Sequence, residues 1–282
     1  MKFVKYHGLG NDYIVINPAD LERNLDEQAI KAICHRNYGP GSDGILLGPF
    51  ESKTCDFRLR ILNPDGSEAE KSGNGLRIFS RYLWDQKLVG TEAFSIETLG
   101  GQVKSHVFAD GKMATVDMGH VSFKSSDIPV KGPLREVLNE SLDVDGLTLS
   151  FCAATIGNPH CVVLCDTISA QDACKWGPFI ETDSRFPNKT NVQFMKIQDR
   201  KNIQIEIWER GAGYTLASGS SSSAAAAVAN KLGFCDSEIS VHMPGGTLQI
   251  SIHDNFFITM TGPVAKVYEG TVDNEVFEQS LI

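Results

Sequence analysis

The chain has 282 residues, which suggests two domains, and its 41% hydrophobic and 22% charged residues are typical of a globular protein. Asp and Glu number 35 against 26 Lys and Arg, so the net charge is −9 and a nucleic-acid partner is not expected. The longest apolar runs, such as residues 224–229, are too short for a membrane helix, and no secretory leader is evident, so we expect a cytoplasmic protein without a membrane partner.

Hydrophobic periodicity predicts strands and helices in both halves of the chain. In the first half, the predicted elements are strands over 3–6 and 13–16, a helix over 25–35, a strand over 56–62 and a helix over 76–87. In the second half, they are a strand over 202–208 and an alanine-rich helix over 222–232. The polar segment 124–147 is expected to be an interdomain or edge region without chemistry of its own.

An internal repeat relates the two halves. Gly10-Asn11 recurs as Gly157-Asn158 after 147 residues, and Ser72-Gly73 recurs as Ser218-Gly219 after 146 residues. Asn63 is matched by Glu209, also after 146 residues, and two further matches keep the same order. Such ordered matches at one spacing indicate a duplicated fold.

The repeat predicts an α+β fold of two pseudo-symmetric domains. The N-terminal domain covers residues 1–120 and is completed by residues 266–282, which lie beyond the second repeat and return to its sheet. The C-terminal domain covers residues 121–265.

Cysteine and histidine spacing argues against a metal centre. The chain has seven residues of each type, without a Cys-x-x-Cys or a His-x-x-x-His pair. An odd number of cysteines in a long chain does not indicate a disulfide scaffold, and zinc ribbons need Cys-x-x-Cys pairs. We therefore expect reduced cysteines and no metal.

Each repeat places a Ser-Gly element where a helix begins. Helix N-termini expose unpaired N–H groups and carry partial positive charge, so they bind anions. Two such ends facing a small anionic substrate would place one proton-handling group on each side of it, which suits inversion at a carbon. Arg210 is the candidate for gripping a carboxylate. Taken singly, each Ser-Gly element also fits a simple helix cap.

Longer motifs add a resemblance to a known family. The sequence resembles diaminopimelate epimerase over essentially the whole chain, through these segments: His7-Gly8-Leu9-Gly10-Asn11-Asp12-Tyr13, Asn63-Pro64-Asp65-Gly66-Ser67, Gly73-Asn74-Gly75-Leu76-Arg77, Gly157-Asn158-Pro159-His160-Cys161, Glu209-Arg210-Gly211-Ala212-Gly213-Tyr214-Thr215 and Pro244-Gly245-Gly246. The resemblance implies a mixed barrel-like sheet around a central helix in each domain. It also implies an isomerase of lysine biosynthesis that works without a cofactor, and a homodimer.

The resemblance further implies the roles of particular residues. Six side chains would contact the amino acid: Asn11, Asn63, Asn158, Asn191, Glu209 and Arg210. The helix ends at Gly73-Asn74 and Gly219-Ser220 would hold its reacting carboxylate. Ser72 and Ser218 occupy the two acid/base positions, so the implied reaction converts LL- to meso-diaminopimelate.

The acid/base pair departs from the family, which has cysteines at both positions. The pKa of an alcohol is near that of water, about 15.7, against about 8.5 for a thiol, so forming the anion costs on the order of 10 kcal/mol more. Lys71 or His160 is a candidate auxiliary base. Two origins of the serines stay open: cysteines substituted to trap a complex, or natural divergence, which Lys71 and the serine run 220–223 favour.

The departure leaves three functions open: the epimerase itself, a diverged paralogue with another amino-acid substrate or chemistry, and a non-catalytic amino-acid-binding protein.

Overall fold

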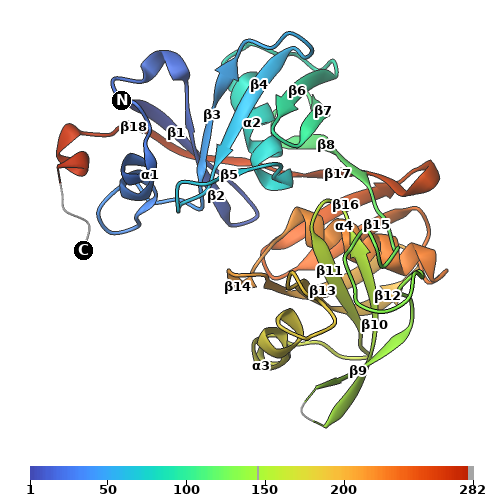
Figure 1. Cartoon of the computed structure of the whole chain (residues 1–282). Coiled ribbons are helices and arrows are strands. Elements are labelled where there is room, and N and C mark those ends of the chain that lie inside the picture. The colour runs from blue at the N-terminus through green and yellow to red at the C-terminus, as the bar shows by residue number, and fades with distance from the viewer. Residues whose placement is uncertain (145, 279–282) are drawn as a thin grey trace. The chain divides into compact units, whose positions relative to one another are not determined.

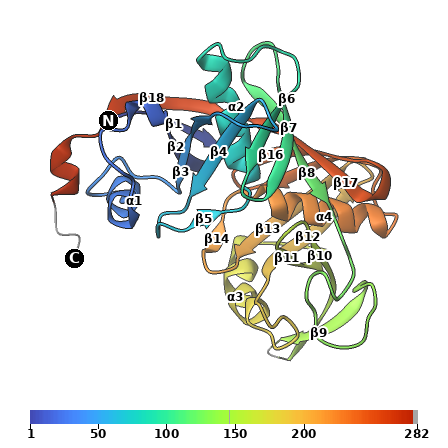
Figure 2. The same ribbon diagram turned by 45° about the horizontal axis from the view of Figure 1, so that its top comes forward.

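The computed structural model describes residues 1–144 and 146–278, which form two compact units (Figure 1). Unit 1 contains residues 1–117 and the described residues from 262 onward, and unit 2 contains residues 118–261. The boundaries fall inside strands β8 (Met113–His120) and β17 (Phe257–Pro263), both of which continue from one unit into the other. Each unit combines a mixed sheet with a long buried helix, so the predicted α+β class is confirmed (Figure 2).

Unit 1 is one twisted sheet around helix α2. Besides its parts of β8 and β17, it contains β1 (Lys2–Gly8), β2 (Asn11–Ile16), α1 (Glu27–Cys34), β3 (Ile45–Phe50), β4 (Phe57–Leu62), β5 (Glu68–Ala69), α2 (Gly73–Asp85), β6 (Phe94–Thr98), β7 (Gly101–Val107) and β18 (Ala265–Thr271). Short 3-10 helices lie at Pro18–Asp20 and Asn274–Phe277. Strand β18 pairs antiparallel with β1, so the segment after the second repeat belongs to the sheet of unit 1.

Unit 2 repeats this plan around helix α4. Besides its parts of β8 and β17, it contains β9 (Glu140–Val144), β10 (Leu147–Thr155), β11 (Pro159–Leu164), α3 (Ala170–Glu181), β12 (Asn191–Asp199), β13 (Asn202–Glu209), β14 (Gly213–Thr215), α4 (Gly219–Lys231), β15 (Glu238–Met243) and β16 (Gly246–Ile252). A 3-10 helix, Asp254–Phe256, precedes β17. No helix within the described residues is long and apolar enough to cross a membrane.

The two sheets share one pattern of strand directions. In unit 1, β1–β2 is antiparallel, β2–β3 parallel, β3–β4 antiparallel, β4–β6 parallel and β6–β7 antiparallel. In unit 2, the pairs β10–β11, β11–β12, β12–β13, β13–β15 and β15–β16 follow the same order of directions. The internal repeat in the sequence therefore corresponds to a repeated fold.

The central helices are buried for different reasons. Helix α2 presents large apolar residues such as Phe79 and Leu83 to the sheet, and both are fully buried. Helix α4 carries the alanine-rich run 224–229, and all six residues are fully buried. Alanine removes the bulk that would keep strands away, so α4 contacts six strands of its unit, β10 to β13, β15 and β16.

Both central helices begin earlier than their hydrophobic patterns predict. Helix α2 starts at Gly73 instead of 76, and α4 starts at Gly219 instead of 222. The first turns contain glycine and serine, which have low helix propensity, but Ser72 and Ser218 cap these turns. The interdomain part of the prediction for 124–147 is corrected, because this segment lies in unit 2 with Ile128 and Val137 buried in its core, whereas the edge part fits strand β9, which pairs with β10.

Candidate active site

In unit 1, the Ser72 hydroxyl lies at the N-terminus of α2. Ser72 is the N-cap, and its Oγ accepts a hydrogen bond from the backbone N–H of Gly75 at 3.1 Å. The same oxygen lies 3.2 Å from the phenol oxygen of Tyr13, which comes from strand β2. The positive end of the helix and these two contacts place a polarised hydroxyl at a site suited to an anion.

A chain of amide contacts runs beside Ser72 into the core. Asn74 Nδ2 donates to Asn11 Oδ1 at 3.0 Å, and Arg77 Nη2 donates to Asn74 Oδ1 at 2.9 Å. Arg77 is fully buried, and burial lowers its pKa to about 10. Asn11 Nδ2 donates to Asp43 Oδ2 at 2.8 Å. Both predicted amides are therefore held in fixed orientations next to the helix end.

A charged cluster secures the turn that carries Asn11. Asp12 forms ion pairs with Lys5 and Arg36, at 2.7 and 2.8 Å. Burial alone would raise the pKa of Asp12, but hydrogen bonds from Arg36 and Lys5 outweigh it and lower the pKa to about 2. Asp43 joins the same cluster through Arg36 and accepts a hydrogen bond from the backbone N–H of Asp12. The acidic residues therefore brace this turn.

In unit 2, Ser218 caps α4 in the same way. Its Oγ accepts from the backbone N–H of Ser221 at 3.4 Å, and the residue is 5% exposed. The hydroxyls of Ser222 and Ser223 donate to the carbonyls of Ser218 and Gly219, each at 2.8 Å, so both are used within the helix. Ser222 also contacts the Met243 sulfur at 3.2 Å, so the last two serines of the run combine bonds within the helix with a contact to strand β15.

Asn158, Ser220 and His160 surround this second helix end. Asn158 Nδ2 lies 3.4 Å from Ser220 Oγ, and Asn158 Oδ1 lies 2.9 Å from His160 Nε2. The His160 ring is fully buried, and burial lowers its pKa to about 3, although the Gln193 side chain acts in the opposite direction. Gln193 in turn donates to Ser221 Oγ at 3.0 Å. A neutral, enclosed His160 is suited to orienting Asn158.

The turn carrying Glu209 and Arg210 is tied to strand β12 and helix α3. The backbone N–H of Arg210 donates to Asn191 Oδ1 at 3.0 Å, and Asn191 Nδ2 donates to the carbonyl of Pro159 at 2.9 Å. Glu181 accepts from the backbone N–H of Gly211 at 3.2 Å. The Arg210 side chain is exposed and donates to the carbonyl of Asn188. Asn191 thus positions the turn, whereas the Arg210 side chain stays exposed.

Two predicted residues of unit 1 lie apart from these amide contacts. Asn63 donates to Ser67 Oγ at 2.9 Å within its own turn. Lys71, next to Ser72, is half-buried, and burial lowers its pKa to about 8, against the opposing effect of Asp117. The ammonium of Lys71 therefore loses its proton more readily than an ordinary lysine does.

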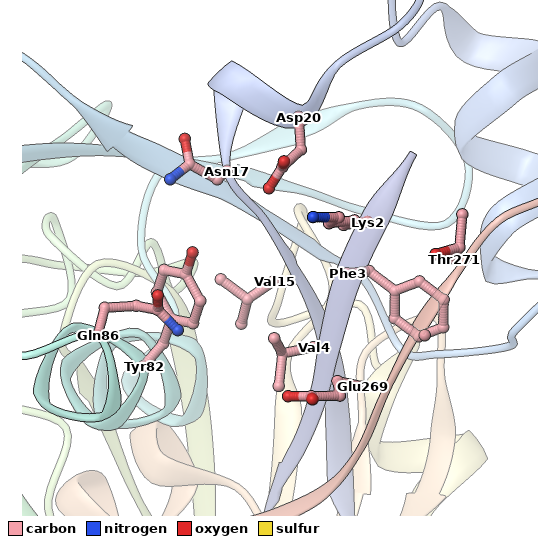
Figure 3. A pocket seen from close by; sticks show the side chains of 11 residues that line it. Lys2, Phe3, Val4, Val15, Asn17, Asp20, Tyr82, Gln86, Glu269 and Thr271 are labelled. Carbon is pink, nitrogen blue, oxygen red and sulfur yellow. The ribbon is translucent and has the colours of Figure 1, made fainter.

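A cavity of about 480 Å³ lies at the other end of α2. It is lined by Tyr82 and Gln86 from the end of this helix and by β1, β2 and β18 residues that include Val4 and Val15 (Figure 3). None of the predicted site residues lines it. The described residues also contain no group of three His, Cys, Asp or Glu side chains placed to hold a metal ion.

Sequence reasoning missed the residues that support the predicted ones. Tyr13 contacts Ser72 and Asp43 accepts from Asn11, whereas Gln193 acts on His160 and Glu181 accepts from the backbone N–H of Gly211, next to Arg210. Tyr13 lies in a quoted motif, and its repeat counterpart is His160, at the same offset of 147 as Asn11 and Asn158. That correspondence was the one signal available. The other three come from segments outside the motifs.

The fold, in which each unit holds a capped central helix within a mixed sheet, is shared with solved structures. A hydroxyproline epimerase from Agrobacterium vitis matches with a TM-score of 0.69 at 14% identity, over 98% of this chain and 93% of that one. A probable proline racemase from Agrobacterium radiobacter matches with a TM-score of 0.68 at 16% identity, over 97% and 93%. These likenesses show the fold.

Sequence comparison identifies the family. The profile of the family described as diaminopimelate epimerase matches residues 3–124 and 152–267. Diaminopimelate epimerase 2 of Nostoc sp. is 63% identical over 98% of this chain and 97% of the relative. The diaminopimelate epimerase of Desulfitobacterium hafniense is 40% identical over 96% and 98%. The chain belongs to the diaminopimelate epimerase family and is an isomerase of the epimerase class.

Proposed function

We infer that the chain interconverts LL- and meso-diaminopimelate, with Ser72 and Ser218 as its two acid/base groups. The observation that carries this proposal is that each unit holds a serine hydroxyl at the N-cap of its buried central helix. One serine, as its alkoxide, would take the α-proton, and the other, as its hydroxyl, would return a proton on the opposite face. The relatives that bear this activity in their names match the chain from end to end, which supports the substrate.

Different residues would bind different parts of the amino acid. The N–H groups at Gly73-Asn74 and Gly219-Ser220 would hold the reacting α-carboxylate, because helix N-termini favour anions. Asn11, Asn63 and Asn158 would bind the remaining polar groups, together with Asn191, Glu209 and Arg210. We also propose an N-terminal domain of residues 1–120 with 266–282 and a C-terminal domain of residues 121–265. A cytoplasmic location and a homodimer are part of the same proposal.

The serines set the chemical difficulty of the reaction. An alcohol yields its anion at a cost on the order of 10 kcal/mol above that of a thiol. The helix ends and hydrogen-bond donors must recover part of this cost. Lys71 supports the proposal as an auxiliary base, because burial lowers its pKa to about 8, close to neutrality. His160, neutral and hydrogen bonded to Asn158, supports a positioning role.

Restoring both thiols tests the substrate assignment. The double substitution Ser72→Cys with Ser218→Cys is expected to raise the epimerisation rate of diaminopimelate at least about a thousandfold, because the proton acceptor ionises near neutral pH. Ser222→Cys, a buried position whose hydroxyl bonds within α4, is the matched control and should leave the rate unchanged.

A second candidate, a diverged paralogue or a binding protein for another amino acid, is favoured by the serine at both acid/base positions. A thermal-shift screen over free amino acids separates the two, since a bound ligand stabilises the folded chain. A double variant that stays inactive, in a chain stabilised by a different amino acid, would overturn the diaminopimelate assignment.

A further inference from the structure

Two tyrosines hold the two ends of helix α2. Tyr6 on β1 and Tyr13 on β2 are direct partners in the antiparallel register, so their side chains lie on the same face of the sheet. The Tyr6 hydroxyl donates to Asp85, the last residue of α2, at 2.9 Å. The Tyr13 hydroxyl lies 3.2 Å from the Oγ of Ser72, the N-cap of the same helix. One phenol is therefore structural, and the other contacts a proposed acid/base group.

The difference in acidity sets the direction of the second hydrogen bond. A phenol ordinarily ionises near pH 10, whereas an aliphatic alcohol is close to water, about 15.7. The phenol is the stronger donor, so of the two directions that the 3.2 Å contact allows, donation from Tyr13 to Ser72 is favoured. Ser72 Oγ also accepts from the Gly75 N–H at 3.1 Å. The Ser72 alkoxide would keep both donors and have a third lone pair for the substrate α-proton.

Packing fixes the ring that makes this contact. Tyr13 is only 8% exposed. A Cβ added at Gly44 would lie 2.7 Å from Tyr13 Cε1, so the absence of a side chain at Gly44 is what admits the ring. The phenol is therefore held against Ser72 by its surroundings and does not depend on the hydrogen bond alone.

Unit 2 lacks this arrangement. The repeat counterpart of Tyr13 is His160, whose Nε2 lies against Asn158. In the described part of the chain, the hydrogen bond accepted by Ser218 Oγ comes from the Ser221 N–H, at 3.4 Å. The two capping hydroxyls therefore differ in the number and closeness of the donors that would stabilise their anions.

We propose that Tyr13 is a positioning residue for Ser72, and that its phenol stabilises negative charge on Ser72 Oγ, so that Ser72 forms its anion more readily than Ser218 does. The proposal rests on the assignment of Ser72 as an acid/base group. Ser72 would first lose its hydroxyl proton, to Lys71 as the candidate auxiliary base, and the alkoxide, held by the hydrogen bond from Tyr13, would then take the substrate α-proton and return to the hydroxyl. A hydrogen bond to a charged group is stronger than one to a neutral group, so its effect grows as the charge develops.

A thiol reporter at position 72 tests the proposal without a substrate. Three variants of the full chain are compared: Ser72→Cys alone, with Tyr13→Phe, and with Tyr6→Phe. Alkylation by iodoacetamide is followed from pH 6 to 10, and mass spectrometry of the peptide containing position 72 separates it from the seven native cysteines. We expect Tyr13→Phe to slow alkylation at pH 7 about tenfold and to move its pH midpoint upward, because one hydrogen bond to the thiolate is lost.

The matched control keeps the test decisive. Tyr6→Phe removes a phenol from the neighbouring strand and should leave the alkylation profile unchanged, whatever it does to the thermal midpoint. The proposal would be overturned if the pH midpoint of alkylation were the same with and without Tyr13. It would also be overturned if Tyr13→Phe and Tyr6→Phe shifted that midpoint equally. The readout involves no diaminopimelate, so a chain inactive on that substrate would refute the proposed function and leave this result standing by itself.

Discussion

Helices α2 and α4 begin alike, but the side chains behind them differ. Each starts with a capping serine, and each first turn contacts an asparagine at the start of a strand: Asn11 begins β2, and Asn158 directly precedes β11. Behind this shared contact, unit 1 places the buried guanidinium of Arg77, and unit 2 places serine hydroxyls and the imidazole of His160. The two units therefore share the backbone and the capping serine at the helix N-terminus, but differ in the side chains packed behind it.

This difference shows where a duplicated fold can change its chemistry. The Asn11–Asn74 contact of 3.0 Å and the Asn158–Ser220 contact of 3.4 Å join corresponding positions of the repeat. The contacting groups at the two helix ends are thus conserved between the halves in place and in polarity. Under the proposed function, the different supporting groups would polarise the two serines unequally and so give unequal proton transfers.

The largest expected effect concerns the buried support of each helix. Arg77→Ala should lower the free energy of unfolding of unit 1 by about 3–5 kcal/mol, because it leaves a cavity and removes a donor to Asn74. Ser223→Ala, the repeat counterpart, should cost about 1 kcal/mol or less, since its hydroxyl bonds only within α4. Urea unfolding followed by hydrogen exchange of peptides from each unit measures both. Equal losses would contradict the difference between the units.

A smaller effect separates the units by pH. His160 has a folded pKa of about 3 against an ordinary 6.5, so between these values the unfolded chain binds a proton that the folded chain does not. Unit 2 should therefore lose stability as the pH falls from 6.5 to 3, by up to about 1.4 kcal/mol per pH unit from this residue.

His160→Gln should make that slope shallower in unit 2 and leave unit 1 unchanged. The same substitution at the exposed His253 is the control and should leave the slope unchanged, because solvent reaches this ring in the folded and the unfolded chain alike. Unfolding free energies measured at several pH values give the slopes. An unchanged slope in the His160→Gln variant would show that the ring is not held neutral by burial.

The sequence predicts the repeat, the fold class and the clusters at each helix end, because glycine, asparagine and serine motifs mark turns and caps directly. It predicts the helix starts three residues late, since Gly73 and Gly75 hide the first turn of α2 from a pattern of apolar residues. Tyr13 and Gln193 could not be assigned as partners of Ser72 and Ser221, because those contacts join residues 59 and 28 positions apart. These contacts depend on the direction in which a side chain leaves its strand, and the spacing of residues along the sequence does not show that direction.

The central claim is that the two capping serines carry protons to and from an α-carbon. Solvent deuterium incorporation at the α-carbons of LL- and meso-diaminopimelate, with the unaltered chain and with Ser72→Ala and Ser218→Ala, tests it most directly. We predict incorporation by the unaltered chain and its loss in both variants, with folding retained. Incorporation by Ser72→Ala at the rate of the unaltered chain would contradict the claim.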